Sequence, residues 1–324
     1  MKSYGQITLV KSGLHCSIQD MGRPGLQHLG ISPSGAADEH ALRWANALLN
    51  NNNSAPALQC CMANVELHFT AATYIAICGA DCDITVNNRA RPNWSAIRIA
   101  AGDTLKLSQA RSGLYSYIAI SGGLQVVKQL GSAAVNEREG LGANSGKALS
   151  NGICLSYKAP QTLQLMRTVH WSYLQKYSSI NLNSNTTAKK DQEIRFIPAQ
   201  QWWKLPPSQQ QLFLGSTWHI GSNSNQMGLR LQGPCIKTKS EARLSSPLAA
   251  GAIQLPADGQ PIAMMKQHQS IGGYPLLGSV YKSDLCRLAQ LAPGQSFSFE
   301  LGSIEQAQKA YALWLAQWDL ETSE

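Results

Sequence analysis

The sequence predicts a mainly β protein with few helices, of the sandwich or barrel kind. Its apolar residues recur mostly every second position, the spacing at which a strand buries one face. Gly, Asn, Asp and Pro separate the short apolar segments, as they do where turns join strands. A chain of 324 residues is long enough for two domains or for one large β unit.

Several segments are expected to be strands because they are short and rich in β-branched or aromatic residues. Three others share one form, a glycine followed by alternating apolar residues, at 102–107, 152–157 and 294–299. The glycine supplies the positive φ that a tight turn can require. Each of the three is therefore predicted to be a turn that leads into a half-buried strand. The strand of the first of them is 104–107, and the remaining predicted strands are 4–10, 74–78, 83–87, 115–120 and 211–218.

Two segments predict helices. Residues 36–49 place alanines on one face, follow Ser34 as the expected cap, and end in a run of asparagines. Residues 304–320 carry an apolar stripe, and Ser303 with Gln306 forms a capping box before it. A polar stretch near 178–192 predicts a linker. We therefore expect an N-terminal β domain over 1–180, a linker or long loop over 181–192, a C-terminal β-barrel over 193–302 and a C-terminal helix over 303–324.

The charge pattern limits the classes of partner. Charged residues make up 14% of the chain and the net charge is +8, but no block of five or six basic residues occurs. We therefore expect no nucleic acid and favour a small anionic ligand or an acidic partner. No apolar run reaches the 18 or so residues of a membrane span, and the first residues lack a signal-peptide hydrophobic region. Eight cysteines without paired CxxC spacing indicate reduced thiols, a cytoplasmic protein and no metal site.

Most catalytic signatures are absent from the sequence. There is no HExxH, GxSxG or CxxC motif, which weighs against zincin, α/β-hydrolase and thioredoxin chemistry. Residues 140–148 resemble a P-loop, but Leu141 stands where the first glycine belongs, and Ala148 cannot bind Mg²⁺ as Ser or Thr would. A flexible glycine loop that could expose backbone N–H groups to an anion is the favoured interpretation.

Two polar clusters remain that a plain core does not require. The first joins Gln19, Asp20, Gly22 and Arg23. Asp20 and Arg23 either pair to brace a turn, or Arg23 presents its planar fork to a carboxylate or phosphate while Asp20 orients it. The second cluster offers glutamine donors and acceptors that suit an amide or urea substrate, although its glycines could equally form a hairpin turn. It comprises Gln254, Gln267, Gln269, Gly272, Gly273 and Tyr274.

A family resemblance rests on several motifs in order along the chain. IQDMGRPG, GISPSGAADEHALRWAN, SYIAISGGL, GAIQLPADGQPI and QSIGGYPLLGSV together resemble the family of bacterial 5-oxoprolinase C components. That family is also labelled allophanate hydrolase subunit 2 or biotin-dependent carboxyltransferase-like, and it includes an antagonist of a sporulation-kinase inhibitor. The resemblance implies two β-barrel-like halves, the second cyclophilin-like, with a pocket between or beside them.

The resemblance also implies a function and a site. Its members work with separate A and B components to convert 5-oxoproline to glutamate, with ATP shared by the complex. Asp20, Arg23 and Gln267 are then expected to be catalytic. We expect Arg23 and Tyr274 to face one cavity. The expected substrate-binding residues are Gln19, Gly22, Gln254, Gln269, Gly272, Gly273 and Tyr274.

Departures from the family pattern keep two other functions open. The resemblance places an acid at Gln59, an Arg at Gln226, an Asp at Gln267 and an Arg at Lys147, and replacement of a carboxylate by Gln removes a charge that could act as a base. One alternative is a biotin-dependent carboxyltransferase acting on urea or a related amide, with a biotin carrier encoded elsewhere. The other is a divergent, non-catalytic regulator whose partner resembles the 5-oxoprolinase B component, a kinase-inhibitor-like protein.

Overall fold

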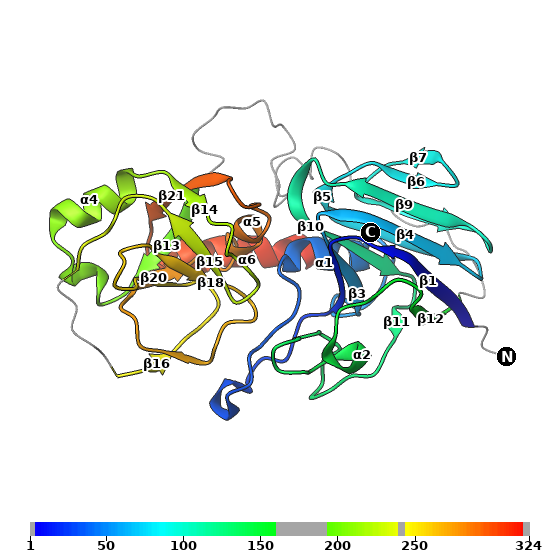
Figure 1. Cartoon of the computed structure of the whole chain (residues 1–324), viewed down its shortest axis with the longest axis horizontal. Coiled ribbons are helices and arrows are strands. Elements are labelled where there is room, and N and C mark those ends of the chain that lie inside the picture. The colour runs from blue at the N-terminus through cyan, green and yellow to red at the C-terminus, as the bar shows by residue number, and fades with distance from the viewer. Residues whose placement is uncertain (1–3, 160–192, 239–243, 320–324) are drawn as a thin grey trace. The chain divides into compact units, whose positions relative to one another are not determined.

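The computed structural model describes residues 4–159, 193–238 and 244–319 (Figure 1). The chain divides into two compact units. Unit 1 is Met1–Arg23 with Ser34–Ser184, and unit 2 is Pro24–Pro33 with Asn185–Glu324. The linker predicted at 181–192 lies outside the described residues. Within the described part of the chain, no helix is both long and apolar enough to cross a membrane.

Unit 1 contains two antiparallel sheets. One has seven strands in the order β11-β12-β1-β4-β9-β6-β7, and the other has five in the order β2-β3-β10-β5-β8. The strands of the larger sheet are β1 (Tyr4–Ser12), β4 (Ala63–Phe69), β6 (Ile84–Val86), β7 (Arg89–Arg91), β9 (Thr104–Gln109), β11 (Leu124–Gln125) and β12 (Cys154–Lys158). Those of the smaller sheet are β2 (His15–Gln19), β3 (Ala57–Cys61), β5 (Thr73–Asp81), β8 (Ser95–Ile99) and β10 (Ser112–Ile120).

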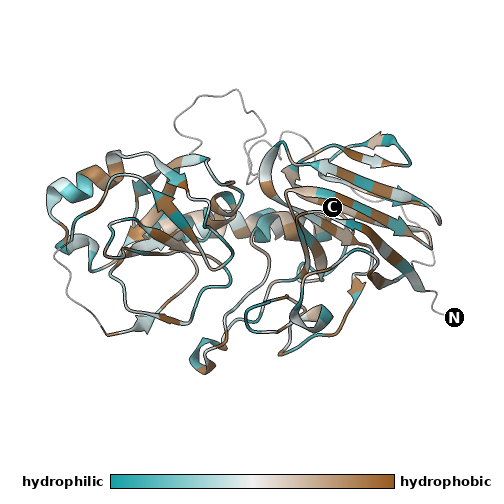
Figure 2. Cartoon of the chain, viewed as in Figure 1, coloured by the Kyte–Doolittle hydropathy of each residue, from teal (hydrophilic) through white to brown (hydrophobic). Residues whose placement is uncertain are grey.

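The apolar residues that recur at every second position of the sequence form the inner faces of these sheets. In β4, for example, Val65, Leu67 and Phe69 are buried while the residues between them are partly or fully exposed. The strands accordingly alternate between hydrophobic and hydrophilic residues (Figure 2). The buried residues of both sheets form one apolar cluster. Its burial is the main stabilising contribution to unit 1.

Helix α1 (Glu39–Ala47) packs on β5 and β10. Its N-cap is Asp38, whose carboxylate accepts a hydrogen bond from Ala41 N–H at 3.0 Å. The prediction of Ser34 as the cap was therefore wrong. Ser34 has a left-handed φ of 55° and lies before the helix, which starts only at Glu39, and its hydroxyl accepts a hydrogen bond from Asn136 Nδ2 at 3.1 Å.

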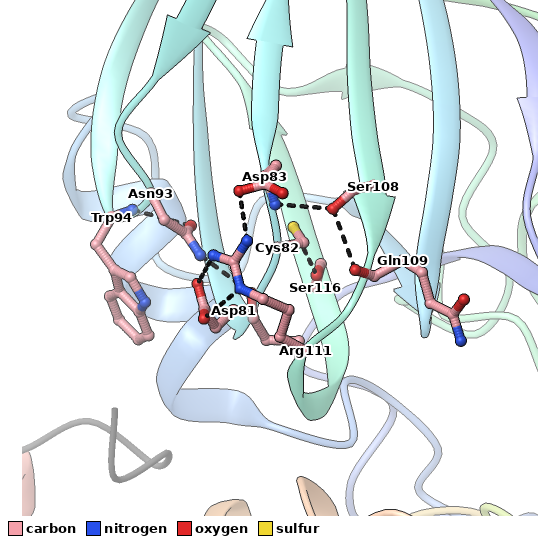
Figure 3. Close-up of polar contacts among 10 residues, drawn as sticks. Asp81, Cys82, Asp83, Asn93, Trp94, Ser108, Gln109, Arg111 and Ser116 are labelled. Carbon is pink, nitrogen blue, oxygen red and sulfur yellow. Dashed lines mark hydrogen bonds and ion pairs between the residues drawn. The ribbon is translucent and has the colours of Figure 1, made fainter. Parts of the chain in front are cut away.

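An exposed ionic clamp ties two turns of unit 1 together (Figure 3). Arg111, between β9 and β10, contacts Asp81 through Nε at 3.2 Å and Nη2 at 3.0 Å, and its Nη1 donates to Asp83. These hydrogen bonds raise the pKa of Arg111. Because the groups are exposed, the clamp fixes the geometry of the turns more than it adds to stability.

Unit 2 is built on a closed barrel with the strand order β13-β20-β17-β18-β15-β14-β21. A separate two-stranded sheet pairs β16 (Ser246–Pro247) with β19 (Ile271–Gly272). The barrel strands are β13 (Glu193–Pro198), β14 (Trp218–Ile220), β15 (Gly228–Gln232), β17 (Ala252–Gln254), β18 (Ile262–Met264), β20 (Leu276–Val280) and β21 (Ser296–Leu301).

Aromatic rings fill one part of this unit. Phe213 stacks on Phe299 at 4.8 Å between ring centroids, and Phe196 and Trp202 meet them edge to face. The helical segments described across both units are η1 (Gln27–Leu29), α1, α2 (Ala143–Gly146), η3 (Trp202–Lys204), α4 (Pro207–Gly215), α5 (Leu285–Ala289) and α6 (Ile304–Asp319).

The predicted class, mainly β with few helices, is confirmed. The three glycine-led segments become β9, β12 and β21, each preceded by a glycine with φ of 85–87°. The capping box of α6 is also confirmed, because Ser303 N donates to Gln306 Oε1 at 3.0 Å and Gln306 N to Ser303 Oγ at 3.2 Å.

The strand predicted at 211–218 was wrong for most of its length. Helix α4 occupies Pro207–Gly215, and only the last residue of the predicted segment, Trp218, lies in β14. Pro207 stands in the first turn of the helix, where its fixed φ and missing N–H cost nothing. The glutamines that follow are good helix formers, and this local preference outweighs the apolar alternation.

Candidate functional site

The first candidate site begins at the end of β2, where Asp20 holds two backbone segments together. Its Oδ1 accepts Gly22 N–H at 2.8 Å and the Ser132 hydroxyl at 2.6 Å, and its Oδ2 accepts Ala133 N–H at 2.7 Å. Three donors to one carboxylate, which is 3% exposed, make a strong brace. Asp20 thus fixes the turn that carries Arg23.

Arg23 is 2% exposed, yet only part of its hydrogen-bonding capacity is used. Its Nη2 donates to the carbonyls of Ala134 at 2.6 Å and Ser132 at 3.5 Å, whereas Nε and Nη1 have no partner among the described residues. Burial lowers the pKa of Arg23, and the charges of Asp20 and Glu139 oppose that shift. A guanidinium is not deprotonated in proteins, so this is a buried cation with two donor nitrogens, Nε and Nη1, available for an anion.

The two sequence interpretations of Asp20 and Arg23 can now be compared. Within the described part of the chain, these two side chains form no ion pair. Instead, both side chains bind the segment 132–134. Asp20 accepts hydrogen bonds from this segment, and Arg23 donates a hydrogen bond to the carbonyl of Ala134. Ser132 and Ala134 were not among the predicted site residues. Their separation of 109–113 residues from the motif hides the contact from local sequence patterns.

The backbone at Gly35 packs directly against the turn that carries Arg23. It has φ of +94°, and a Cβ there would lie 2.8 Å from the nitrogen of Gly22 and 3.0 Å from the carbonyl oxygen of Asp20. The main chain confirms the approach, since Ala36 N–H donates to that carbonyl at 2.9 Å. Only glycine fits at such a position.

Gln19 and Gln59 lie nearby in β2 and β3 and are fully buried. Gln19 Nε2 donates to Ser17 Oγ and to the Val135 carbonyl, so it supports the same loop that Arg23 contacts. Gln59 Oε1 accepts from Ala37 N at 2.9 Å and from the Tyr117 hydroxyl at 2.8 Å. Gln59 therefore positions the chain that enters α1.

Several backbone N–H groups of the glycine loop at 140–148 form hydrogen bonds within the protein. Leu141 N donates to Asn136 O, Gly142 N to Gln129 Oε1, Ala143 N to Ala133 O and Ala148 N to Glu137 Oε1. These N–H groups are used inside the protein. The suggestion that this loop offers its backbone to an anion was therefore wrong at those four positions.

The second candidate site lies in unit 2, around the end of β17. Gln254 is 1% exposed, and neither end of its carboxamide has a hydrogen-bond partner within the described ranges. Its Nε2 lies 2.6 Å from the place where a Cβ on Gly272 would stand. The structure thus brings together two of the predicted substrate-binding residues.

The other predicted residues of this cluster are placed differently. Gln267 Nε2 donates to Gln226 Oε1 at 2.9 Å, which joins two of the positions that depart from the family pattern. Gln269 is half-buried, Gly273 is exposed and Tyr274 is 52% exposed. Arg23 belongs to unit 1 and Tyr274 to unit 2, so the expected common cavity stays a prediction.

Comparison with known proteins places the chain in a family. Residues 29–301 match the family model described as carboxyltransferase domain, subdomain A and B. The chain belongs to this family. It is 31% identical over 309 residues to the 5-oxoprolinase C component of Escherichia coli (strain K12), covering 94% of both chains. It is 30% identical to the 5-oxoprolinase C component of Haemophilus influenzae, covering 90% of both.

A solved structure supports the fold. The crystal structure of the Kluyveromyces lactis urea carboxylase matches 94% of this chain with a TM-score of 0.83 and 25% identity. The match spans only 28% of that chain. The activity of the complete urea carboxylase therefore does not transfer with the likeness.

Proposed function

We propose that this chain is the C component of an ATP-dependent 5-oxoprolinase, which opens the 5-oxoproline lactam to glutamate together with partners that resemble the A and B components. The names of the two bacterial relatives, which match over nearly their full length, support this choice. The observation that carries it is the buried Arg23, whose Nε and Nη1 lack partners among the described residues.

Arg23 suits the carboxylate of 5-oxoproline. Guanidinium N–H groups donate charge-assisted hydrogen bonds to carboxylate oxygens, and such bonds are strongest where water is excluded. The carboxylate of Asp20 already accepts three hydrogen bonds, so in this proposal Asp20 positions the turn rather than touching the substrate. Gln19 and Gly22 support the same turn through the loop at 132–135 and the carboxylate of Asp20.

The lactam requires activation before water can attack it, because resonance stabilises the amide. ATP, as a substrate of the complex, supplies that activation by phosphorylating the carbonyl oxygen. The four loop N–H groups of 141–148 that are used internally argue against a phosphate site at this loop. We therefore assign the nucleotide to the complex and not to a glycine loop of this chain.

Gln267 has a restricted role in this proposal. A carboxamide neither gains nor loses a proton near neutral pH, so Gln267 cannot act as a general base. Paired with Gln226, it can orient a polar group of the substrate. A proton acceptor for the attacking water would then come from a partner protein or from the phosphorylated intermediate.

Two other functions have support of their own. The fold likeness to a urea carboxylase favours a biotin-dependent carboxyltransferase acting on urea or a related amide. The uncharged pair of Gln226 and Gln267 favours a non-catalytic regulator of a partner that resembles the B component. The three candidates differ in what they need: ATP and two partners, a biotin carrier, or one partner with no turnover.

Co-expression with the two partner components tests the proposal. We expect a stable complex that releases ADP and glutamate only when 5-oxoproline is present. Complex formation without turnover, together with turnover by the double variant Gln226→Arg, Gln267→Asp, would instead support the regulator. Urea-dependent consumption of carboxybiotin would support the carboxyltransferase.

A further inference from the structure

Gln254 is an unusual buried side chain. Buried polar atoms almost always have hydrogen-bond partners, and an amide left without any destabilises the folded protein. Gln254 lacks them at both ends of its carboxamide within the part of the chain that the structure describes. Exchanging the oxygen and nitrogen positions of the amide would not change this conclusion.

The side chains opposite Gln254 in the neighbouring strands are apolar and offer its carboxamide no hydrogen bond. It pairs with Ile262 of β18 and Leu276 of β20, and directly opposite residues of antiparallel strands share one face of the sheet. Both neighbours pack against the apolar cluster of Leu248, Ala252 and Met264. A hydrogen bond formed in such surroundings is stronger than one formed in water.

Two backbone features lie beside the carboxamide of Gln254. The register between β17 and β20 shifts between Ile253 and Gln254, and such bulges re-aim side chains beside functional sites. Gly272, in the two-stranded sheet of β16 and β19, leaves the space that the amide occupies. A Cβ on Gly272 would meet Gln254 Nε2 at 2.6 Å and Leu248 Cδ1 at 2.7 Å.

The same barrel shows what a satisfied glutamine does. Gln260 accepts Gly233 N–H at 2.9 Å and donates to the Gly233 carbonyl at 3.1 Å. Its carboxamide thus binds the N–H and C=O of one residue at two points. Gln254 presents the same donor and acceptor with neither used among the described residues.

We propose that Gln254 recognises the cis N–H and C=O edge of a cyclic amide through two hydrogen bonds. The inference rests on the proposed function, because 5-oxoproline carries such an edge in its lactam ring. A lactam offers a donor and an acceptor side by side, which is the complement of a carboxamide. The edge of urea has the same complementarity.

The same pair of hydrogen bonds also distinguishes the substrate from its product. Ring opening turns the lactam into an amine and a carboxylate, and a carboxylate offers only acceptors. The ring no longer holds the donor and the acceptor side by side, so the product lacks the fixed edge that complements the carboxamide of Gln254. Gln254 therefore favours the closed ring and disfavours glutamate. A phosphate group has no donor either, so it does not complement both ends of this carboxamide.

The test compares Gln254→Leu with the matched variant Gln260→Leu. Without ligand, we expect Gln254→Leu to melt roughly 2–4 °C higher, because an unpartnered buried amide is removed, and Gln260→Leu to melt lower, because two bonds are lost. Binding of 5-oxoproline, 2-pyrrolidone and urea is measured on the full chain, alone and with its partner proteins. N-methyl-2-pyrrolidone, which lacks the N–H donor, is the reference.

We expect the wild-type protein to prefer 2-pyrrolidone over its N-methyl analogue by about tenfold or more. Gln254→Leu should lose this preference and Gln260→Leu should keep it. Gly272→Ala gives a second route, because its methyl group displaces the amide and should abolish the preference in a folded protein. An unchanged preference in Gln254→Leu, a lower melting temperature without ligand, or no binding of any of the three amides overturns the inference.

Failure of the proposed function gives a different result. Turnover of 5-oxoproline by a Gln254→Leu complex with unchanged KM refutes the role of Gln254 and leaves the function standing. A Gln254-dependent preference for cyclic amides in a protein whose complex releases no ADP refutes the function and leaves the recognition standing.

Discussion

The carboxamide nitrogen of Gln267 donates to the side-chain oxygen of Gln226 at 2.9 Å, and the backbone N–H of Gln267 donates to the carbonyl of Gln226 at 2.8 Å. The family resemblance implies Asp and Arg at these two positions. The two departures are therefore one change in space: a neutral pair stands where opposite charges are expected. A loss of both charges keeps the contact, whereas a loss of one would leave the other half-buried and unpaired.

The first prediction concerns the coupling between these two residues. The double variant Gln226→Arg, Gln267→Asp should be more stable than the sum of its single variants by about 0.5–3 kcal/mol, because the two new charges meet each other. Urea unfolding of the wild type, both single variants and the double variant measures this coupling. Raising the salt concentration should reduce it.

A control separates pairing from a general effect of charge. Gln226→Arg combined with Gln125→Asp, an exposed position in unit 1, should give additive changes. Additivity in the Gln226 and Gln267 pair as well would show that the contact does not connect the two side chains energetically.

The second prediction concerns Arg23. Arg23→Ala should weaken 5-oxoproline binding by the assembled complex roughly tenfold to a hundredfold, the effect of losing hydrogen bonds to a charged group. The melting temperature should change little. The lost bonds to the Ala134 and Ser132 carbonyls are offset by removal of a buried cation that has two unpartnered donor nitrogens among the described residues. Titration calorimetry measures the affinity for 5-oxoproline, and scanning calorimetry measures the melting temperature.

Arg23→Lys is the matched variant, because it keeps the charge and loses the planar fork. It should bind 5-oxoproline with intermediate affinity if the fork matters. A large fall in the melting temperature of Arg23→Ala with normal binding would return Arg23 to a purely structural role.

Local features of this protein can be predicted from sequence, whereas contacts distant in sequence cannot. The capping box of Ser303 and Gln306 spans three residues, so its pattern is complete within one segment. The cap of α1 was missed because Ser34 and Asp38 are both good caps and only the turn geometry separates them. The partners of Asp20 lie more than a hundred residues away. The sequence therefore identified the motif but not the segment that Asp20 binds.

The third prediction concerns two thiols with a raised pKa, those of the half-buried Cys61 and the buried Cys82. Burial raises the pKa of Cys61 and of Cys82 from 9.0 to about 11. Both therefore stay protonated in the folded protein at pH 9–10, whereas in the unfolded chain they begin to lose their protons near pH 9. A group whose pKa is raised by folding contributes stability below its unfolded pKa and loses it as the pH rises, here between about pH 9 and pH 11.

Two measurements check the thiol prediction. At pH 8, an alkylating reagent should modify the exposed Cys154 and Cys235 and leave Cys61 and Cys82 unmodified in the folded protein. In urea unfolding between pH 8 and pH 11, the wild type should lose more stability than the double variant Cys61→Ala, Cys82→Ala. Equal slopes for the two proteins would contradict the raised pKa values.

The last prediction compares two glycines that follow Arg23 in the sequence. Gly35 and Gly30 both have positive φ, +94° and +79°, but a Cβ on Gly35 would strike the backbone of residues 20–22, while one on Gly30 would meet nothing within 4 Å. Gly30→Ala should therefore cost only the backbone term, about 1 kcal/mol. Gly35→Ala should cost at least about 3 kcal/mol more and also weaken 5-oxoproline binding, because it displaces the turn that holds Arg23. Urea unfolding and calorimetry on both variants make the comparison, and equal losses of stability would show that the close approach at Gly35 does not constrain this turn.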